Sequence, residues 1–162
     1  MHTMPTKIYI GADHAGFEMK QQLIRFLEKK NFEVIDQGAF EFDEEDDYPD
    51  FIFPVAKAVS TDPNSFGIVI GGSGQGEAIV ANRVPGIRAV VFNGQYEPAD
   101  GREVPQEIII SREHNDANIL SLGARFLSQQ EAEEAVETWL DTAFSGEERH
   151  IRRISKIDQM GL

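Results

Sequence analysis

The chain has 162 residues, of which 41% are hydrophobic and 27% charged, a length and composition that predict one globular domain with a full hydrophobic core. It carries no cysteine, which excludes disulfides, thiolate metal sites and a cysteine nucleophile, and its net charge of −13 argues against nonspecific nucleic-acid binding. Because no apolar run is long enough to cross a membrane and the first residues do not resemble a secretion signal, we expect a cytoplasmic protein that makes no membrane contact.

Strands and helices are expected to alternate along the chain. Runs of β-branched and aromatic residues predict strands at 7–13, 32–38, 66–72, 87–92 and 119–124. Apolar residues at helical spacing predict helices at 16–31, 48–60, 76–83, 128–144 and 146–160. Alternation of this kind predicts an α/β fold in which a five-stranded parallel sheet has helices on both faces. We expect a single domain over residues 1–162.

The segment 93–110 is the unusual connection of the chain. Its sequence NGQYEPADGREVPQE is rich in turn-forming residues and predicts a long loop. Loops of this length in compact domains are often functional.

Distinctive polar residues follow three of the predicted strands. Asp13 and His14 follow the first strand, a glycine-rich loop follows the third, and Arg125 follows the fifth. Ligands of open α/β sheets bind at the carboxyl ends of the strands, so we expect these positions to converge.

The glycine-rich loop, GGSGQGEAIVANR at 71–83, fails the known nucleotide-binding patterns. The dinucleotide fingerprint needs glycine at 77 or 79, and the P-loop needs lysine at 77, where the chain has Glu77. A carboxylate there would repel nucleotide phosphates. The backbone N–H groups at this predicted helix N-terminus can still hold another anion, such as an enediolate, with Glu77 as the base that forms it. The alternative is that Glu77 is only favourable charge in a first helical turn.

The remaining charged residues give weaker signals. The histidines lack zinc-ligand spacing, so we expect no metal. Arg149 and Arg153 are four residues apart on one predicted helix and share a face that suits a phosphate dianion. The run of six acids in EFDEEDD, residues 41–47, is expected to be a solvated loop.

Six motifs in register resemble the ribose-5-phosphate isomerase type B and galactose-6-phosphate isomerase family. They are IGADHAGFEMK, DYPD, IVIGGSGQGEAIVANR, GIRAVV, REHNDANILSLGARF and RHIRRI, and the match runs from about residue 7 to 157. The resemblance implies a Rossmann-like three-layer sandwich. It also implies a homodimer with active sites shared between subunits, and a C-terminal helix at 146–160 that contributes to the dimer or to the active site. Whether dimers pair into tetramers is left open by the sequence.

The resemblance further implies aldose–ketose isomerisation of a sugar phosphate, with no metal and no cofactor. Some members use a cysteine at the position of Gly71 as the base, whereas others use a glutamate at the position of Glu77, as this sequence does. Roles then transfer by position: Glu77 moves the proton, Ser73 and the loop stabilise the enediolate, and Asp13 and His114 open the sugar ring. The substrate-binding set is Gly72, Gly74, Gln75, Gly76 and Asn115, with His14, Arg125, Arg149 and Arg153 on the phosphate.

The substrate most consistent with the resemblance is ribose 5-phosphate, converted to ribulose 5-phosphate. A hexose 6-phosphate, such as galactose or allose 6-phosphate, is the first alternative, since the 93–110 segment is longer than the compact helix that the family usually has there. A Rossmann-like binding module without catalysis is the second alternative.

Overall fold

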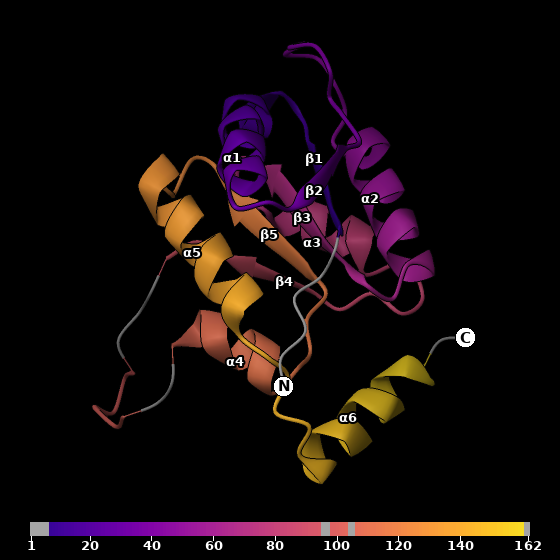
Figure 1. Cartoon of the computed structure of the whole chain (residues 1–162), viewed down its shortest axis with the longest axis vertical. Coiled ribbons are helices and arrows are strands. Elements are labelled where there is room, and N and C mark those ends of the chain that lie inside the picture. The colour runs from indigo at the N-terminus through magenta and orange to yellow at the C-terminus, as the bar shows by residue number, and fades with distance from the viewer. Residues whose placement is uncertain (1–6, 95–97, 104–105, 161–162) are drawn as a thin grey trace.

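A five-stranded parallel sheet forms the centre of the computed structural model, which describes residues 7–94, 98–103 and 106–160 (Figure 1). Its strands are β1 (Lys7–Ala12), β2 (Glu33–Asp36), β3 (Ser65–Gly71), β4 (Ala89–Phe92) and β5 (Ile119–Gly123). Their order across the sheet is β2-β1-β3-β5-β4, and every neighbouring pair is parallel. The predicted parallel sheet is therefore confirmed.

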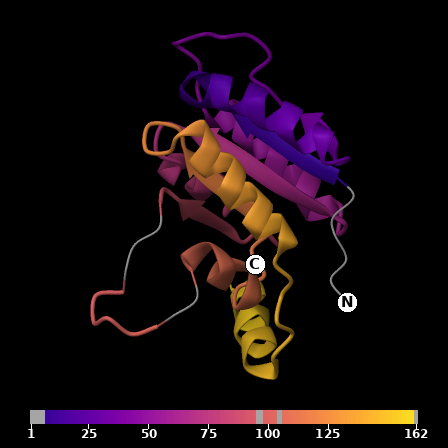
Figure 2. The same ribbon diagram turned by 60° about the vertical axis from the view of Figure 1, so that its left-hand side comes forward.

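Helices cover both faces of this sheet and complete a three-layer arrangement (Figures 1 and 2). The helices are α1 (Phe17–Lys29), α2 (Pro49–Thr61), α3 (Gln75–Ala81), α4 (Glu107–Glu113), α5 (Gln129–Asp141) and α6 (Glu148–Asp158), and a short 3₁₀ turn spans His14–Gly16. Helices α1 and α5 share one hydrophobic core with the sheet, and α2 and α3 share a second core on its other face. The expected elements form with ends shifted by at most about three residues.

The residues of β3 and α5 show why the sequence forms these elements. The strand β3 is apolar along most of its length because it lies between two other strands and is covered on both faces. Helix α5 begins with a capping box in which Ser128 and Glu131 satisfy each other's backbone N–H groups. Its Trp139 is fully buried and packs 4.9 Å from the ring of Phe66.

The prediction of a loop over all of 93–110 is wrong at its end, because α4 begins at Glu107. Ile108 is buried against α5 and the sheet, and this packing stabilises a seven-residue helix that would be marginal alone. Residues 95–97 and 104–105 of this segment lie outside the described residues.

The chain changes direction across the sheet between β1 and β3. It runs outward from β1 to β2, then returns to place β3 on the other side of β1. Ligand sites of open α/β sheets lie at such a switch point, at the carboxyl ends of the strands. Residues that follow β1, β3 and β5 lie at this carboxyl edge, whereas residues that precede β5 lie at the opposite, amino edge.

Helix α6 extends away from the sheet, beyond α4 (Figures 1 and 2). It exposes about half of the side chains of Ile151 and Ile157. In the described residues, no helix combines the length and the apolar composition needed to cross a membrane.

Candidate active site at the carboxyl edge of the sheet

The carboxyl edge brings together Asp13, the glycine-rich loop and Arg125, as predicted. Asp13 follows β1 directly, and its carboxylate accepts a hydrogen bond from the backbone N–H of Ala15 at 3.0 Å. The segment after β5 is joined to the loop after β3, because Arg125 donates its backbone N–H to the carbonyl of Gly72 at 3.1 Å. The guanidinium of Arg125 lies close beside Gly72, about 3.0 Å from where a Cβ would be.

Glu77 is the buried acid of this edge. It lies in the first turn of α3 and is only 4% exposed, although exposed acids are the common occupants of first turns. Burial raises the pKa of its carboxyl group, and the nearby charge of Asp13 raises it further, against the lowering effect of the Glu77 and Gly74 backbone N–H groups. A carboxylate in this setting is suited to accept and return a proton near neutral pH.

Gly71, the last residue of β3, makes room for that carboxylate. A Cβ at residue 71 would lie 2.2 Å from both Cδ and Oε1 of Glu77, well inside ordinary contact. Any side chain at residue 71 would therefore compete with the carboxylate of Glu77 for one space.

The loop between Gly71 and α3 is held by hydrogen bonds from three side chains, two of which, Ser121 and Asn93, the sequence did not single out. Gly74 has φ of +78°, a conformation that glycine adopts readily, and its carbonyl accepts a 2.7 Å hydrogen bond from the buried hydroxyl of Ser121. The side-chain amide of Asn93 donates to the carbonyl of Ser73 at 2.8 Å. The Ser73 hydroxyl accepts from the backbone N–H of Gln75 at 3.2 Å. These bonds fix the loop at the N-terminus of α3.

His14 has a partner in the acidic segment 41–47, and the prediction that this whole segment is solvated is wrong at one residue. Asp46 accepts a 2.7 Å hydrogen bond from Nδ1 of His14 and a 3.1 Å bond from its backbone N–H. The hydrogen bond that His14 donates to Asp46 is the largest cause that raises the pKa of His14.

Asp13, His14 and Asp46 also place possible metal-ligand atoms within 4.8 Å of one another among the described residues. Nδ1 of His14 is already engaged by Asp46, so a metal here would either bind His14 through Nε2 or replace that hydrogen bond.

His114 and Asn115 do not join this cluster within one chain. They precede β5, and the register pairs the start of β5 with Gly67 and its end with Gly71. The four steps between the five residues of β5, at about 3.3 Å each, separate the two edges by roughly 13 Å. His114 instead stacks on His150 of α6, with ring centroids 4.3 Å apart.

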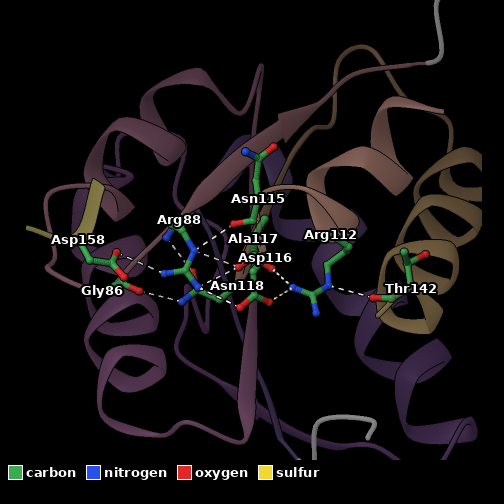
Figure 3. Close-up of polar contacts among 9 residues, drawn as sticks. All are labelled: Gly86, Arg88, Arg112, Asn115, Asp116, Ala117, Asn118, Thr142 and Asp158. Atoms are coloured by element: carbon green, nitrogen blue, oxygen red, sulfur yellow. Dashed lines mark hydrogen bonds and ion pairs between the residues drawn. The ribbon is translucent and has the colours of Figure 1, made fainter. Parts of the chain in front are cut away.

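Two arginines anchor the turn that carries His114 and Asn115 (Figure 3). Arg88 donates to the carbonyls of Asn115 and Asp116 at 3.0 to 3.1 Å, and Arg112 donates to Asp116, Ala117 and Thr142. Figure 3 shows the side-chain amide of Asn115 pointing away from this network. The turn is therefore rigid, with the Asn115 amide left available.

Arg149 and Arg153 lie on α6, on the same side of the molecule as His114. Both side chains are exposed, and Arg149 is paired with Glu147 at 2.9 Å. Within one chain, the predicted phosphate set is thus divided, with His14 and Arg125 at the carboxyl edge and the two α6 arginines with His114.

The fold and the carboxyl edge define an α/β protein with a buried acid set beside a glycine-rich loop at a helix N-terminus. The model of the family described as Ribose/Galactose Isomerase matches residues 8–157. A protein named ribose-5-phosphate isomerase B from Mycolicibacterium paratuberculosis is 44% identical over 148 residues, covering 91% of this chain and 87% of that protein. The chain belongs to the ribose/galactose isomerase family.

Solved structures agree with this assignment. Ribose-5-phosphate isomerase B of Clostridium thermocellum superposes with a TM-score of 0.82 at 45% identity, covering 94% of this chain and 95% of the other. The enzyme of Mycoplasma genitalium, solved with bound ribulose-5-phosphate, gives a TM-score of 0.83 at 36% identity and covers 96% of each chain.

Proposed function

We propose that this protein interconverts ribose 5-phosphate and ribulose 5-phosphate, with Glu77 as the base that moves the proton between C2 and C1. The observation that carries the proposal is the buried Glu77 carboxylate, whose raised pKa and position at the N-terminus of α3 suit reversible proton transfer. The names of the relatives and the bound ribulose-5-phosphate of one of them support the choice of substrate.

The reaction starts with Glu77 ionised and the sugar ring open. Glu77 takes the proton from C2, the C2–H electron pair forms the C1–C2 double bond, and negative charge develops on the oxygen at C1. The loop N–H groups at Gly72, Gly74 and Gly76, with the Ser73 hydroxyl, stabilise that charge, while the Gln75 N–H donates to the Ser73 oxygen and orients it. Glu77 then returns its proton to C1, the O2 hydroxyl proton leaves as the C2 carbonyl forms, and O1 gains a proton.

Charge separation along the substrate supports this orientation. The phosphate dianion is attracted to His14 and Arg125 and repelled by Glu77 and Asp13. Arg149 and Arg153, one helical turn apart, supply two more guanidinium groups for it. The reacting carbons then lie at the α3 end of the loop beside Glu77, at the opposite end of the substrate from the phosphate.

A second copy of the chain completes the site in this proposal. His114, which opens the ring with Asp13, and Asn115 lie at the amino edge of their own sheet, and α6 extends from that side with exposed arginines and isoleucines. We infer a homodimer in which the α6 helix and the His114 turn of one subunit face the carboxyl edge of the other. The whole chain, 1–162, then acts as one isomerase domain whose C-terminal helix serves the partner.

The proposed base is tested by Glu77→Gln in an assay of ribulose 5-phosphate formation with EDTA present. We expect kcat to fall by about 10³-fold or more, because the amide cannot accept the proton. Glu107→Gln is the matched control, since Glu107 is an exposed first-turn glutamate of α4. Full activity of Glu77→Gln would exclude Glu77 as the base. Turnover of galactose or allose 6-phosphate in place of ribose 5-phosphate would correct the substrate.

The shared site is tested by mixing two inactive variants, Glu77→Gln and His114→Asn, after co-refolding or co-expression. If each site takes Glu77 from one subunit and His114 from the other, half the dimers are mixed and carry one intact site, which restores about a quarter of wild-type activity. Recovery of no activity, with mixed dimers present, would show that each site is built within one chain.

A further inference from the structure

Asp46 is the one inward-facing acid of the segment 41–47. The other acids of that segment are exposed, whereas the side chain of Asp46 is 8% exposed. The composition of this segment predicts a solvated loop, so the burial of Asp46 comes from the way the loop folds.

The hydrogen bonds that the Asp46 carboxylate accepts from the described residues all come from one residue, His14. Within the described part of the chain, both hydrogen bonds that it accepts come from His14, at 2.7 Å from Nδ1 and 3.1 Å from the backbone N–H, and both reach Oδ1. Its Oδ2 is buried without a hydrogen-bond partner there. Buried polar atoms are rarely left in this state, and such an exception calls for a functional explanation.

These two bonds orient the imidazole of His14. Nδ1 must carry the proton that Asp46 accepts, so Nε2 is the nitrogen left for a ligand. The ring of Phe42 meets the imidazole edge-on at 6.5 Å, and Phe42 in turn meets Phe17 at 6.1 Å. The His14 side chain is 29% exposed, which leaves the ring accessible to a ligand.

The charges near His14 come from four segments, since Glu18 and Arg25 of α1 line the same surface hollow as His14. Asp46, in the loop before α2, and Asp13, after β1, favour the protonated ring, whereas partial burial and Arg125, after β5, oppose it. The hydrogen bond to Asp46 is the largest of these effects, and the pKa of His14 is raised overall.

We propose that Asp46 is a positioning residue that holds His14 as an oriented cation for the phosphate group of the substrate. This inference rests on the proposed function, in which His14 binds that phosphate, and it adds a residue that contacts no substrate itself. Without Asp46, the positive charge of Arg125 would oppose protonation of His14 and the pKa of His14 would be lower. The phosphate would then lose one cation as the pH rises above neutrality.

The substitution Asp46→Asn separates charge from shape. An asparagine oxygen can still accept both bonds from His14, so the loop keeps its anchor, but the negative charge is removed. Asp47→Asn is the matched control, because Asp47 is the next residue and is exposed. His14→Gln provides the background in which Asp46 has no imidazole to act on.

Two measurements test the inference. The chain has four histidines, so NMR titration can follow His14, and its pKa is expected to fall by about one unit in Asp46→Asn and to stay unchanged in Asp47→Asn. KM for ribose 5-phosphate in Asp46→Asn is expected to rise roughly three- to tenfold at pH 8 and little at pH 6, with kcat nearly unchanged. In the His14→Gln background, Asp46→Asn should change KM no further.

An unchanged pKa of His14 in Asp46→Asn would overturn the inference. So would a rise in KM that is equal at pH 6 and pH 8, because that result assigns Asp46 to loop packing alone. Failure of the proposed function is distinguishable: a wild-type protein without turnover would refute the isomerase, while the titration of His14 and its response to inorganic phosphate would still report on Asp46.

Discussion

Adding one methyl group at residue 71 should disable the site with little loss of stability. In Gly71→Ala the new Cβ would lie 2.2 Å from Cδ of Glu77, whereas ordinary contact begins at 3.4 Å. The carboxylate must therefore move by about 1.2 Å, and a misplacement of about 1 Å can cost roughly 100-fold in rate. The contacted atoms are the tip of a side chain, so the overpacking cost should stay near the lower end of the usual range, about 1 kcal/mol.

The assay for Gly71→Ala combines steady-state kinetics with urea unfolding. We expect kcat to fall about 100-fold while the free energy of unfolding falls by about 1 kcal/mol. The matched control places the same methyl in a Glu77→Ala chain, where the carboxylate is gone and the substitution should cost no stability. A normal kcat in Gly71→Ala, or the same loss of stability in both backgrounds, would refute the proposed competition for space.

Three further substitutions test buried polar residues at the carboxyl and amino edges of the sheet. Because burial raises the pKa of Glu77, its contribution to stability is full below the unfolded pKa of about 4.3 and is lost as the pH rises through the folded pKa. Urea unfolding should therefore show that Glu77→Gln is more stable than wild type at pH 8. A gain in stability confined to pH 4 would contradict this. Arg112→Met should lower the free energy of unfolding by about 3 kcal/mol, since buried carbonyls lose their donor, whereas the exposed Arg102→Met should change it by less than about 0.5 kcal/mol. Ser121→Ala should cost about 1–3 kcal/mol and lower kcat, because the carbonyl of Gly74 loses its buried partner; unchanged kcat would show that the loop holds its shape without this bond.

The alternation of elements and the edge at which ligands bind follow from local patterns in the sequence. Apolar strands and amphipathic helices are encoded by short-range spacing, so their order was predictable and with it the convergence of Asp13, the glycine-rich loop and Arg125. Helix α4 was missed because turn formers precede it and packing against α5 stabilises it. Its signal was the run Ile108–Ile110, one residue before the REHN motif.

Contacts between segments far apart in the chain could not be predicted from the sequence. Asp46 reaches His14 across 32 positions, and Ser121 reaches Gly74 across 47, and neither pair has a local pattern. The separation of His114 from Asp13 was readable, however. A residue that precedes a parallel strand lies at the amino edge of the sheet, so chain order alone places His114 opposite the residues that follow the strands.

The contact between Gly71 and Glu77 also constrains how such a site can change over generations. Under the proposed function, a base carried on residue 71 and a carboxylate at residue 77 would need the same volume, so a chain with both would be overpacked and a chain with neither would lack the base. Passing from one arrangement to the other takes two substitutions, and each order runs through an impaired intermediate. The two solutions are therefore separated by a fitness valley, and a single mutation at either position leads away from function.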